Sequence, residues 1–143
     1  MANGPSPHLS WSELTCKDGT PYPQEWRSER GLFLALEFER IRAIVGVPIV
    51  VLSAYRTLEW NKLVGGAKVS QHVQGRALDL KPPEGWTVDR FYNLIHLHAL
   101  ALESGIYGLG RYPTFVHFDI RLPGETDRLI AWQGSRAWAE VKA

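Results

Sequence analysis

The stretch SQHVQGRALD, residues 70–79, carries a histidine and an aspartate seven positions apart with a glycine between them. The segment around Asp79 is short and apolar, and the two prolines that follow it predict that a buried strand of about four residues ends there. Gly75 offers a turn that folds His72 back over this strand. The imidazole and the carboxylate are therefore expected to meet at one point.

A second histidine lies in an expected strand over residues 115–121. Side chains alternate between the two faces of a strand, so His117 and Asp119 share one face while the opposite face is wholly apolar. The apolar face is expected to pack on the core, which leaves His117 on the outer side of the sheet. A hydrolytic zinc site is expected to have three protein ligands, such as two imidazoles and one carboxylate, and an open fourth position. His72, Asp79 and His117 are therefore the candidate metal ligands.

The other histidines and the cysteine are expected to have ordinary structural roles. His96 and His98 are two positions apart on an expected helix, so their side chains point about 200° apart and cannot grip one ion. His8 lies in the first, turn-rich segment. Cys16 is the only cysteine, which excludes an intrachain disulfide and a cysteine-cluster metal site. A nucleophilic Cys16 beside a histidine base is a rival interpretation that requires a contact in space.

Residues 70–79 resemble the Ser-x-His-x-x-Gly-x-Ala-x-Asp signature of the zinc D-alanyl-D-alanine carboxypeptidases and L-alanyl-D-glutamate endopeptidases. Three further stretches resemble segments of this family, in the same order along the chain. Residues 8–16 resemble an N-terminal segment of its phage and bacterial members. LSAYR at 52–56 resembles its Ser-Gly-Tyr-Arg strand end, and FVHFD at 115–119 resembles its last ligand strand. The resemblance implies a hedgehog/DD-peptidase-like fold and a peptide of bacterial peptidoglycan as the substrate. It also implies that His72, Asp79 and His117 hold one zinc ion.

The implied reaction also needs a group that moves protons, and the chain offers several candidates. Many members of the family place an acid three residues before the last histidine, where this chain has Thr114, and threonine cannot serve as a base near neutral pH. Asp119 is the local substitute, which either reaches a water on the metal or orients a ligand histidine. A salt bridge from Asp119 to Arg121 or Arg111 is the structural alternative. Glu125 is another candidate.

Two further residues are expected at the substrate. Arg56 follows a buried strand and, in the resemblance, faces the metal pocket, where its planar guanidinium is suited to a substrate carboxylate or a developing oxyanion. A structural pair with a buried acid is the alternative for Arg56. Ser70 is expected to donate a hydrogen bond to the terminal carboxylate of the substrate, and its alternative is to cap the loop. The tryptophans are expected mostly in the core, although Trp60 and Trp86 lie beside the expected site loops.

The expected elements favour an α+β fold with a small antiparallel sheet and helices packed on one side, because strands and helices mix without a regular alternation. A short helix is expected after Ser10, where Glu13 completes a capping box. Longer helices are expected over 24–45, with a loosening of that helix near Gly31 as the alternative, and over 57–63 and 87–104. Strands are expected over 49–52, 77–80, 115–121 and 129–133 and near residue 106.

Length and charge exclude several classes of protein. At 143 residues and 45% hydrophobic content, the chain is expected to form one domain over residues 8–143 after a lead-in at 1–7. The net charge of +1 provides no basic stripe for nucleic acid. No apolar run is long enough for membrane insertion, and the first residues lack the pattern of a signal peptide. The sequence leaves the oligomeric state open.

These observations predict a zinc peptidase that hydrolyses peptide bonds in stem peptides or cross-links of peptidoglycan. Synthesis in the cytoplasm and action on the wall after release would suit a lysis enzyme of a phage or prophage. The alternative is a metal-binding module without catalysis, for example in a phage particle. The hedgehog signalling domain, similar in fold and ligands, represents this use of the scaffold, and Thr114 would mark the lost base.

Overall fold

One five-stranded sheet, in the order β1-β2-β4-β3-β5, organises the part of the chain that the computed structural model describes, residues 3–121 and 128–135. The strands are β1 (Val50–Ser53), β2 (Ala77–Lys81), β3 (Gly108–Arg111), β4 (Val116–Asp119) and β5 (Ile130–Gln133). The helices are α1 (Trp11–Leu14), the 3-10 helix η1 (Gln24–Trp26), α2 (Arg30–Val45), α3 (Leu58–Leu63) and α4 (Val88–Ala99). The mixture confirms the predicted α+β class.

The sheet is mixed, and the prediction of a purely antiparallel sheet is wrong at one edge. Four strands pair antiparallel, whereas β5 pairs parallel to β3. The reason is geometric. Asp119 at the end of β4 pairs with Gly108, which in turn pairs with Ile130 at the start of β5. β5 therefore begins at the end of the sheet where β4 finishes and runs opposite to β4, which is the direction of β3.

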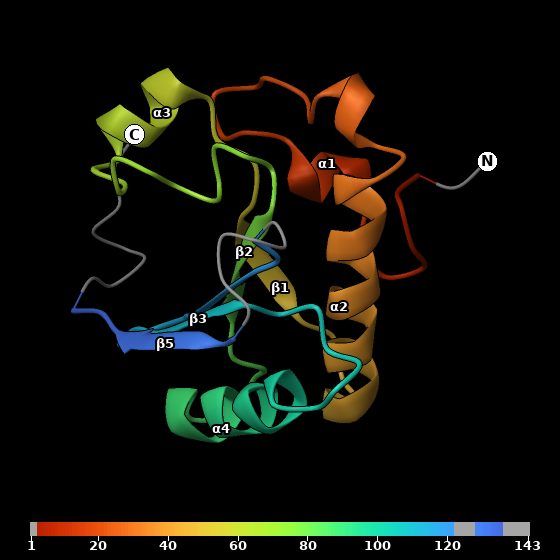
Figure 1. Cartoon of the computed structure of the whole chain (residues 1–143), viewed down its shortest axis with the longest axis vertical. Coiled ribbons are helices and arrows are strands. Elements are labelled where there is room, and N and C mark those ends of the chain that lie inside the picture. The colour runs from red at the N-terminus through yellow and green to blue at the C-terminus, as the bar shows by residue number, and fades with distance from the viewer. Residues whose placement is uncertain (1–2, 122–127, 136–143) are drawn as a thin grey trace.

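The two faces of the sheet differ in polarity, as the alternation in β4 predicted. One face carries apolar side chains of the core, among them Leu78, Leu80, Leu109, Val116 and Phe118. Helix α4 packs on β3 and β4 and contacts α2, which runs along the sheet, and α1 and α3 lie at the opposite end of the molecule from α4 (Figure 1). Across the other face runs a row of paired residues: Ser53, Asp79, His117, Gly110 and Trp132.

The single helix expected over residues 24–45 is divided into η1 and α2, so that prediction is wrong near its start. Glu29 has a non-helical backbone and precedes the first turn of α2. The break lets Trp26 leave the helical path and pack edge-on against Tyr22 and Tyr55. The helix expected to reach Ser104 also ends sooner, at Ala99. The Leu100 N–H still bonds back four residues to His96, but the Ala101 and Ser104 N–H groups bond back only three.

The lead-in expected over residues 1–7 is tied to the body from Asn3 onward. The Asn3 carbonyl accepts a hydrogen bond from the Trp11 N–H, and Ser6 Oγ donates to the Glu39 carboxylate at 2.6 Å. The predicted capping box is confirmed, because Ser10 and Glu13 exchange hydrogen bonds at the start of α1. Among residues 3–121 and 128–135, no helix has the length and apolar character needed to span a membrane.

Candidate metal centre

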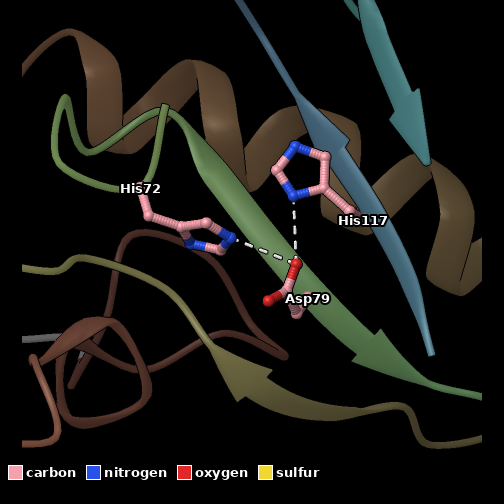
Figure 2. A group of neighbouring side chains, drawn as sticks. All are labelled: His72, Asp79 and His117. Atoms are coloured by element: carbon pink, nitrogen blue, oxygen red, sulfur yellow. Dashed lines mark hydrogen bonds and ion pairs between the residues drawn. The ribbon is translucent and has the colours of Figure 1, made fainter. Parts of the chain in front are cut away.

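His72, Asp79 and His117 come together from three segments, as the sequence predicted. His72 lies on the loop before β2, Asp79 lies in β2, and His117 lies opposite Asp79 on β4 (Figure 2). The Nε2 atom of His72 is 3.1 Å from Asp79 Oδ1, and the Nδ1 atom of His117 is 3.0 Å from the same oxygen. All three side chains are largely shielded from solvent. Two strands and one loop therefore converge on one buried carboxylate oxygen.

A glycine turn holds His72 in this position. The Gly75 N–H and the Arg56 N–H both donate to the His72 carbonyl, and Gly75 has a left-handed backbone with φ of 69°. A Cβ atom at Gly75 would lie 2.7 Å from the Trp26 ring, so the turn has no room for a side chain. The buried Tyr22 hydroxyl donates to the Gly75 carbonyl at 2.7 Å. The aromatic cluster around Tyr22 thus fixes the turn, and the turn fixes the imidazole.

The second nitrogen of each imidazole is held by a neighbour. His72 Nδ1 donates to the Ala54 carbonyl at 2.7 Å, so Nε2 is the nitrogen that faces Asp79. His117 Nε2 lies 2.9 Å from Asp119 Oδ2, so Nδ1 faces Asp79. Arg121 in turn donates to Asp119 at 2.8 Å. Metal-binding histidines are typically oriented in this way, by a carbonyl or carboxylate on the nitrogen away from the ion.

The three residues fit one zinc ion. Their ligand atoms all lie within 4.8 Å of one another. Tetrahedral zinc with bonds of about 2.0 to 2.1 Å separates its ligand atoms by about 3.3 Å, close to the distances between Asp79 Oδ1 and the two histidine nitrogens. Since Nδ1 of His72 carries the proton, its Nε2 presents a lone pair to a carboxylate oxygen. Two acceptors that face each other in a buried site are satisfied by a shared cation.

The protonation of the site is strongly perturbed. Burial lowers the pKa of His72, which keeps that imidazole neutral. Burial would raise the pKa of Asp79, but the two imidazoles beside it, of His72 and His117, outweigh burial and hold the pKa well below its usual range. Burial likewise opposes the charged form of His117, but hydrogen bonds to Asp119 and Asp79 raise its pKa to about 9. Without metal, His117 therefore holds a proton at neutral pH, and a metal ion must displace it.

A pocket of about 400 Å³ opens on this site. Its walls include the metal-site residues and the loop that precedes β2, together with Tyr112, Phe115, Arg121 and Trp132. Tyr112 and Trp132 were not among the site residues predicted from the sequence. Side chains alternate along residues 130–133, so the sequence could have shown that Trp132 shares a face with Ile130. It could not have shown that β5 pairs with β3, which brings that face to the pocket. Trp86 lines a different pocket, with Thr114.

Asp119 is not free to act as a base, because its carboxylate is already paired. It is fully buried, and its two oxygens contact His117 and Arg121. Of the two functional roles expected for Asp119, this geometry favours the orientation of His117 over contact with water. Thr114 is exposed and lies outside the pocket. Within the described ranges, Asp79 and Asp119 are the only carboxylates that line the pocket. Glu125 lies outside the described residues.

Arg56 and Ser70 both line the pocket, and both are engaged with the protein itself. The Arg56 guanidinium reaches Asp79 Oδ2 at 3.4 Å and Asn61 Oδ1 at 3.1 Å, in a nearly buried position. This is the pair with a buried acid that was the alternative for Arg56. Ser70 Oγ accepts the His72 N–H at 3.1 Å, which caps the loop as in its alternative, while its own proton remains to donate.

The remaining histidines and the cysteine lie away from the site, as expected. His98 pairs with the buried Glu37 at 3.0 Å and joins α4 to α2. His96 stacks on Tyr92, His8 pairs with Glu39, and Cys16 is buried.

Comparison with models of protein families gives a match over most of the chain. A family model described as Peptidase M15 matches residues 7–119 of the chain. The matched span contains all three candidate ligands and stops at the last residue of β4, before β5. No curated protein matches the chain.

Proposed function

The chain belongs to the M15 peptidase family, a family of zinc-dependent metallopeptidases, and on that basis we propose that it hydrolyses peptide bonds in the stem peptides or cross-links of bacterial peptidoglycan. The observation that carries the proposal is the convergence of His72 Nε2 and His117 Nδ1 on Asp79 Oδ1 at the wall of a pocket. The likeness of residues 70–79 to the signature of the peptidoglycan-cleaving members supports the choice of substrate.

His72, Asp79 and His117 would hold the ion. Zinc in such a site supplies a Lewis acid and a water whose pKa is lowered toward neutrality. The Ala54 carbonyl and the Asp119 carboxylate fix the two imidazoles, so both metal-binding nitrogens are aimed before the ion arrives. Fixed ligands reduce the reorganisation that binding and reaction require.

Arg56 and Ser70 are proposed to meet the peptide. Arg56 holds Asp79 and also borders the pocket, so its positive charge lies close to where a peptide carbonyl would be polarised. The Ser70 hydroxyl accepts from the His72 N–H and retains its own proton for a carbonyl or carboxylate of the substrate. The likeness of residues 8–16 to phage members of the family supports a role in wall lysis.

A second candidate function is a zinc-binding module without catalysis. Two observations favour it. Both carboxylates that line the pocket in the described part of the chain are engaged, and Thr114 stands where many members of the family carry an acid. Such a module would bind zinc and wall peptides without cleaving them.

One assay separates the two functions. Zinc content and the release of peptides from purified peptidoglycan are measured for the parent, for His72→Ala and for the matched control His96→Ala, which changes a histidine outside the pocket. The peptidase predicts zinc and peptide release in the parent and the control, and neither in His72→Ala. Zinc without release in the parent supports the module. A parent that neither binds zinc nor releases peptide contradicts both.

A further inference from the structure

Trp132 lies on the metal face of the sheet, two strands away from His117. In the paired row, Gly110 of β3 lies between them, and a Cβ atom there would be 2.6 Å from the Trp132 ring. The glycine lets the indole lie across β3, where its ring centroid comes within 5.2 Å of that of His117. Trp132 therefore forms a wall of the metal pocket, which the loop that carries His72 also lines.

Tyr112 completes this wall. Its ring stacks on the buried Phe115, with centroids 4.5 Å apart and planes 6° apart, and its hydroxyl accepts a hydrogen bond from Trp132 Nε1 at 2.9 Å. A Cβ atom at Gly134 would collide with the Tyr112 ring, so this glycine also gives room to the pair. Both rings are thus fixed by neighbours before any ligand binds, which reduces the entropy that binding costs.

The hydroxyl of Tyr112 has a proton left to donate. Within residues 3–121 and 128–135, Trp132 is its one hydrogen-bond partner, and Trp132 is the donor in that bond. A phenol that accepts one hydrogen bond can still donate one. The other polar side chains that face the pocket from the sheet, Asp79, His117, Asp119 and Arg121, already bond to one another or to Arg56.

We propose that Tyr112 donates a hydrogen bond to a carbonyl oxygen of the bound peptide, and that the adjoining indole of Trp132 is the surface on which a side chain of that peptide lies. This inference rests on the proposed function and names a specificity element of the same site. Trp132 lies on β5, outside the span matched by the family model. The wall therefore combines a residue within the matched span with one beyond it, which gives this chain a means of selecting among wall peptides.

The test uses the zinc-loaded full chain and a soluble synthetic stem peptide that contains both an L-alanyl-D-glutamate and a D-alanyl-D-alanine bond. Tyr112→Phe removes the hydroxyl and keeps the ring that stacks on Phe115. Tyr92→Phe is the matched control, because Tyr92 lies on α4 and does not line the pocket. We expect kcat/KM to fall about fivefold to tenfold in Tyr112→Phe, as for the loss of one hydrogen bond. Zinc content and Tm should stay at parent values in both variants.

The other outcomes of the cleavage assay either overturn the inference or leave the decision to a measurement of peptide binding. If the parent cleaves and Tyr112→Phe stays within twofold of it, the inference is wrong and the proposed function stands. Loss of zinc or of thermal stability in Tyr112→Phe assigns a structural role to the residue and also overturns it. If the parent does not cleave, the proposed function fails, and calorimetric binding of the same peptide decides: a fivefold to tenfold weaker Kd in Tyr112→Phe supports the inference, whereas an equal Kd or no binding overturns it.

Discussion

His117 Nε2 lies 2.9 Å from Asp119 Oδ2, on the next outward position of the same strand. Alternation along β4 brings the two side chains to one face, and Arg121 holds the far side of the carboxylate. His117 can therefore present only Nδ1 to the centre of the site. A short strand with the pattern His-x-Asp thus contains both a candidate metal ligand and the group that orients it.

Asp119→Asn tests this relationship. The amide keeps the shape of the side chain but removes its charge, so the hydrogen bond that orients the His117 ring becomes weaker. We expect zinc affinity to fall about tenfold to 100-fold, measured by competition with a chromogenic chelator. Asp89→Asn, which changes an exposed acid paired with Arg111, should leave the affinity unchanged. If Asp119 instead acts as a base, the variant will bind zinc like the parent and lose turnover alone.

Zinc affinity should depend on pH through His117. The raised pKa of about 9 means that the metal-free site holds a proton on His117 at neutral pH, and zinc must displace it. The lowered pKa of His72 means that His72 has no proton to release in the same range. Apparent affinity should therefore rise about tenfold per pH unit from pH 7 and level off near pH 9. Calorimetry in buffers of different ionisation enthalpy should find one proton released per zinc, and a pH-independent affinity would contradict this.

The stability of the metal-free protein should fall at alkaline pH. A histidine whose pKa is higher in the folded state contributes stability that is fully present below its unfolded pKa of about 6.5. This contribution is lost as the pH rises toward the folded value of about 9. Urea unfolding of metal-free protein between pH 6 and 9 should show the decline. His117→Gln should remove most of it, and an unchanged slope in that variant would assign the decline to other groups.

Gly75→Ala should loosen the turn that carries His72. Alanine at φ of 69° is strained, and its Cβ would press on Trp26 at 2.7 Å. We expect a loss of about 1 to 3 kcal/mol in the free energy of unfolding, with weaker zinc binding. Gly85→Ala provides the control, because Gly85 has φ of 84° and nothing within 4 Å of the added atom. The two variants should differ by the cost of the Trp26 contact, and equal losses would show that the contact is unimportant.

The convergence of His72, Asp79 and His117 could be predicted from the sequence, partly from local patterns and partly from the resemblance of residues 70–79 to a family signature. Alternation in β4 places His117 outward, and a glycine turn brings His72 back over Asp79, so each position follows from a few neighbouring residues. The same local pattern placed Asp119 beside His117. The role of Asp119 could not be predicted, because the sequence is compatible both with contact to a water and with contact to an imidazole. The distance from Asp119 to His117 in the structure separates the two roles.

Other features depend on pairs that lie far apart along the chain. Trp132 joins the pocket only because β5 adds to the free edge of β3, and Gly110 accommodates it only in that register. The division of the helix expected over 24–45 depends on Trp26 packing against Tyr22 and Tyr55. The spacing of hydrophobic residues indicates which face of a helix or strand is buried, but not which element packs against that face. These features could therefore be seen only in the structure.

The most direct measurement is X-ray absorption at the zinc edge of the zinc-loaded chain. The account predicts one zinc per chain with two imidazole nitrogens and oxygen ligands at about 2.0 to 2.2 Å, and no bound zinc in His72→Ala. A sulfur neighbour at about 2.3 Å, which would bring in Cys16, or a zinc without two imidazoles, would contradict it.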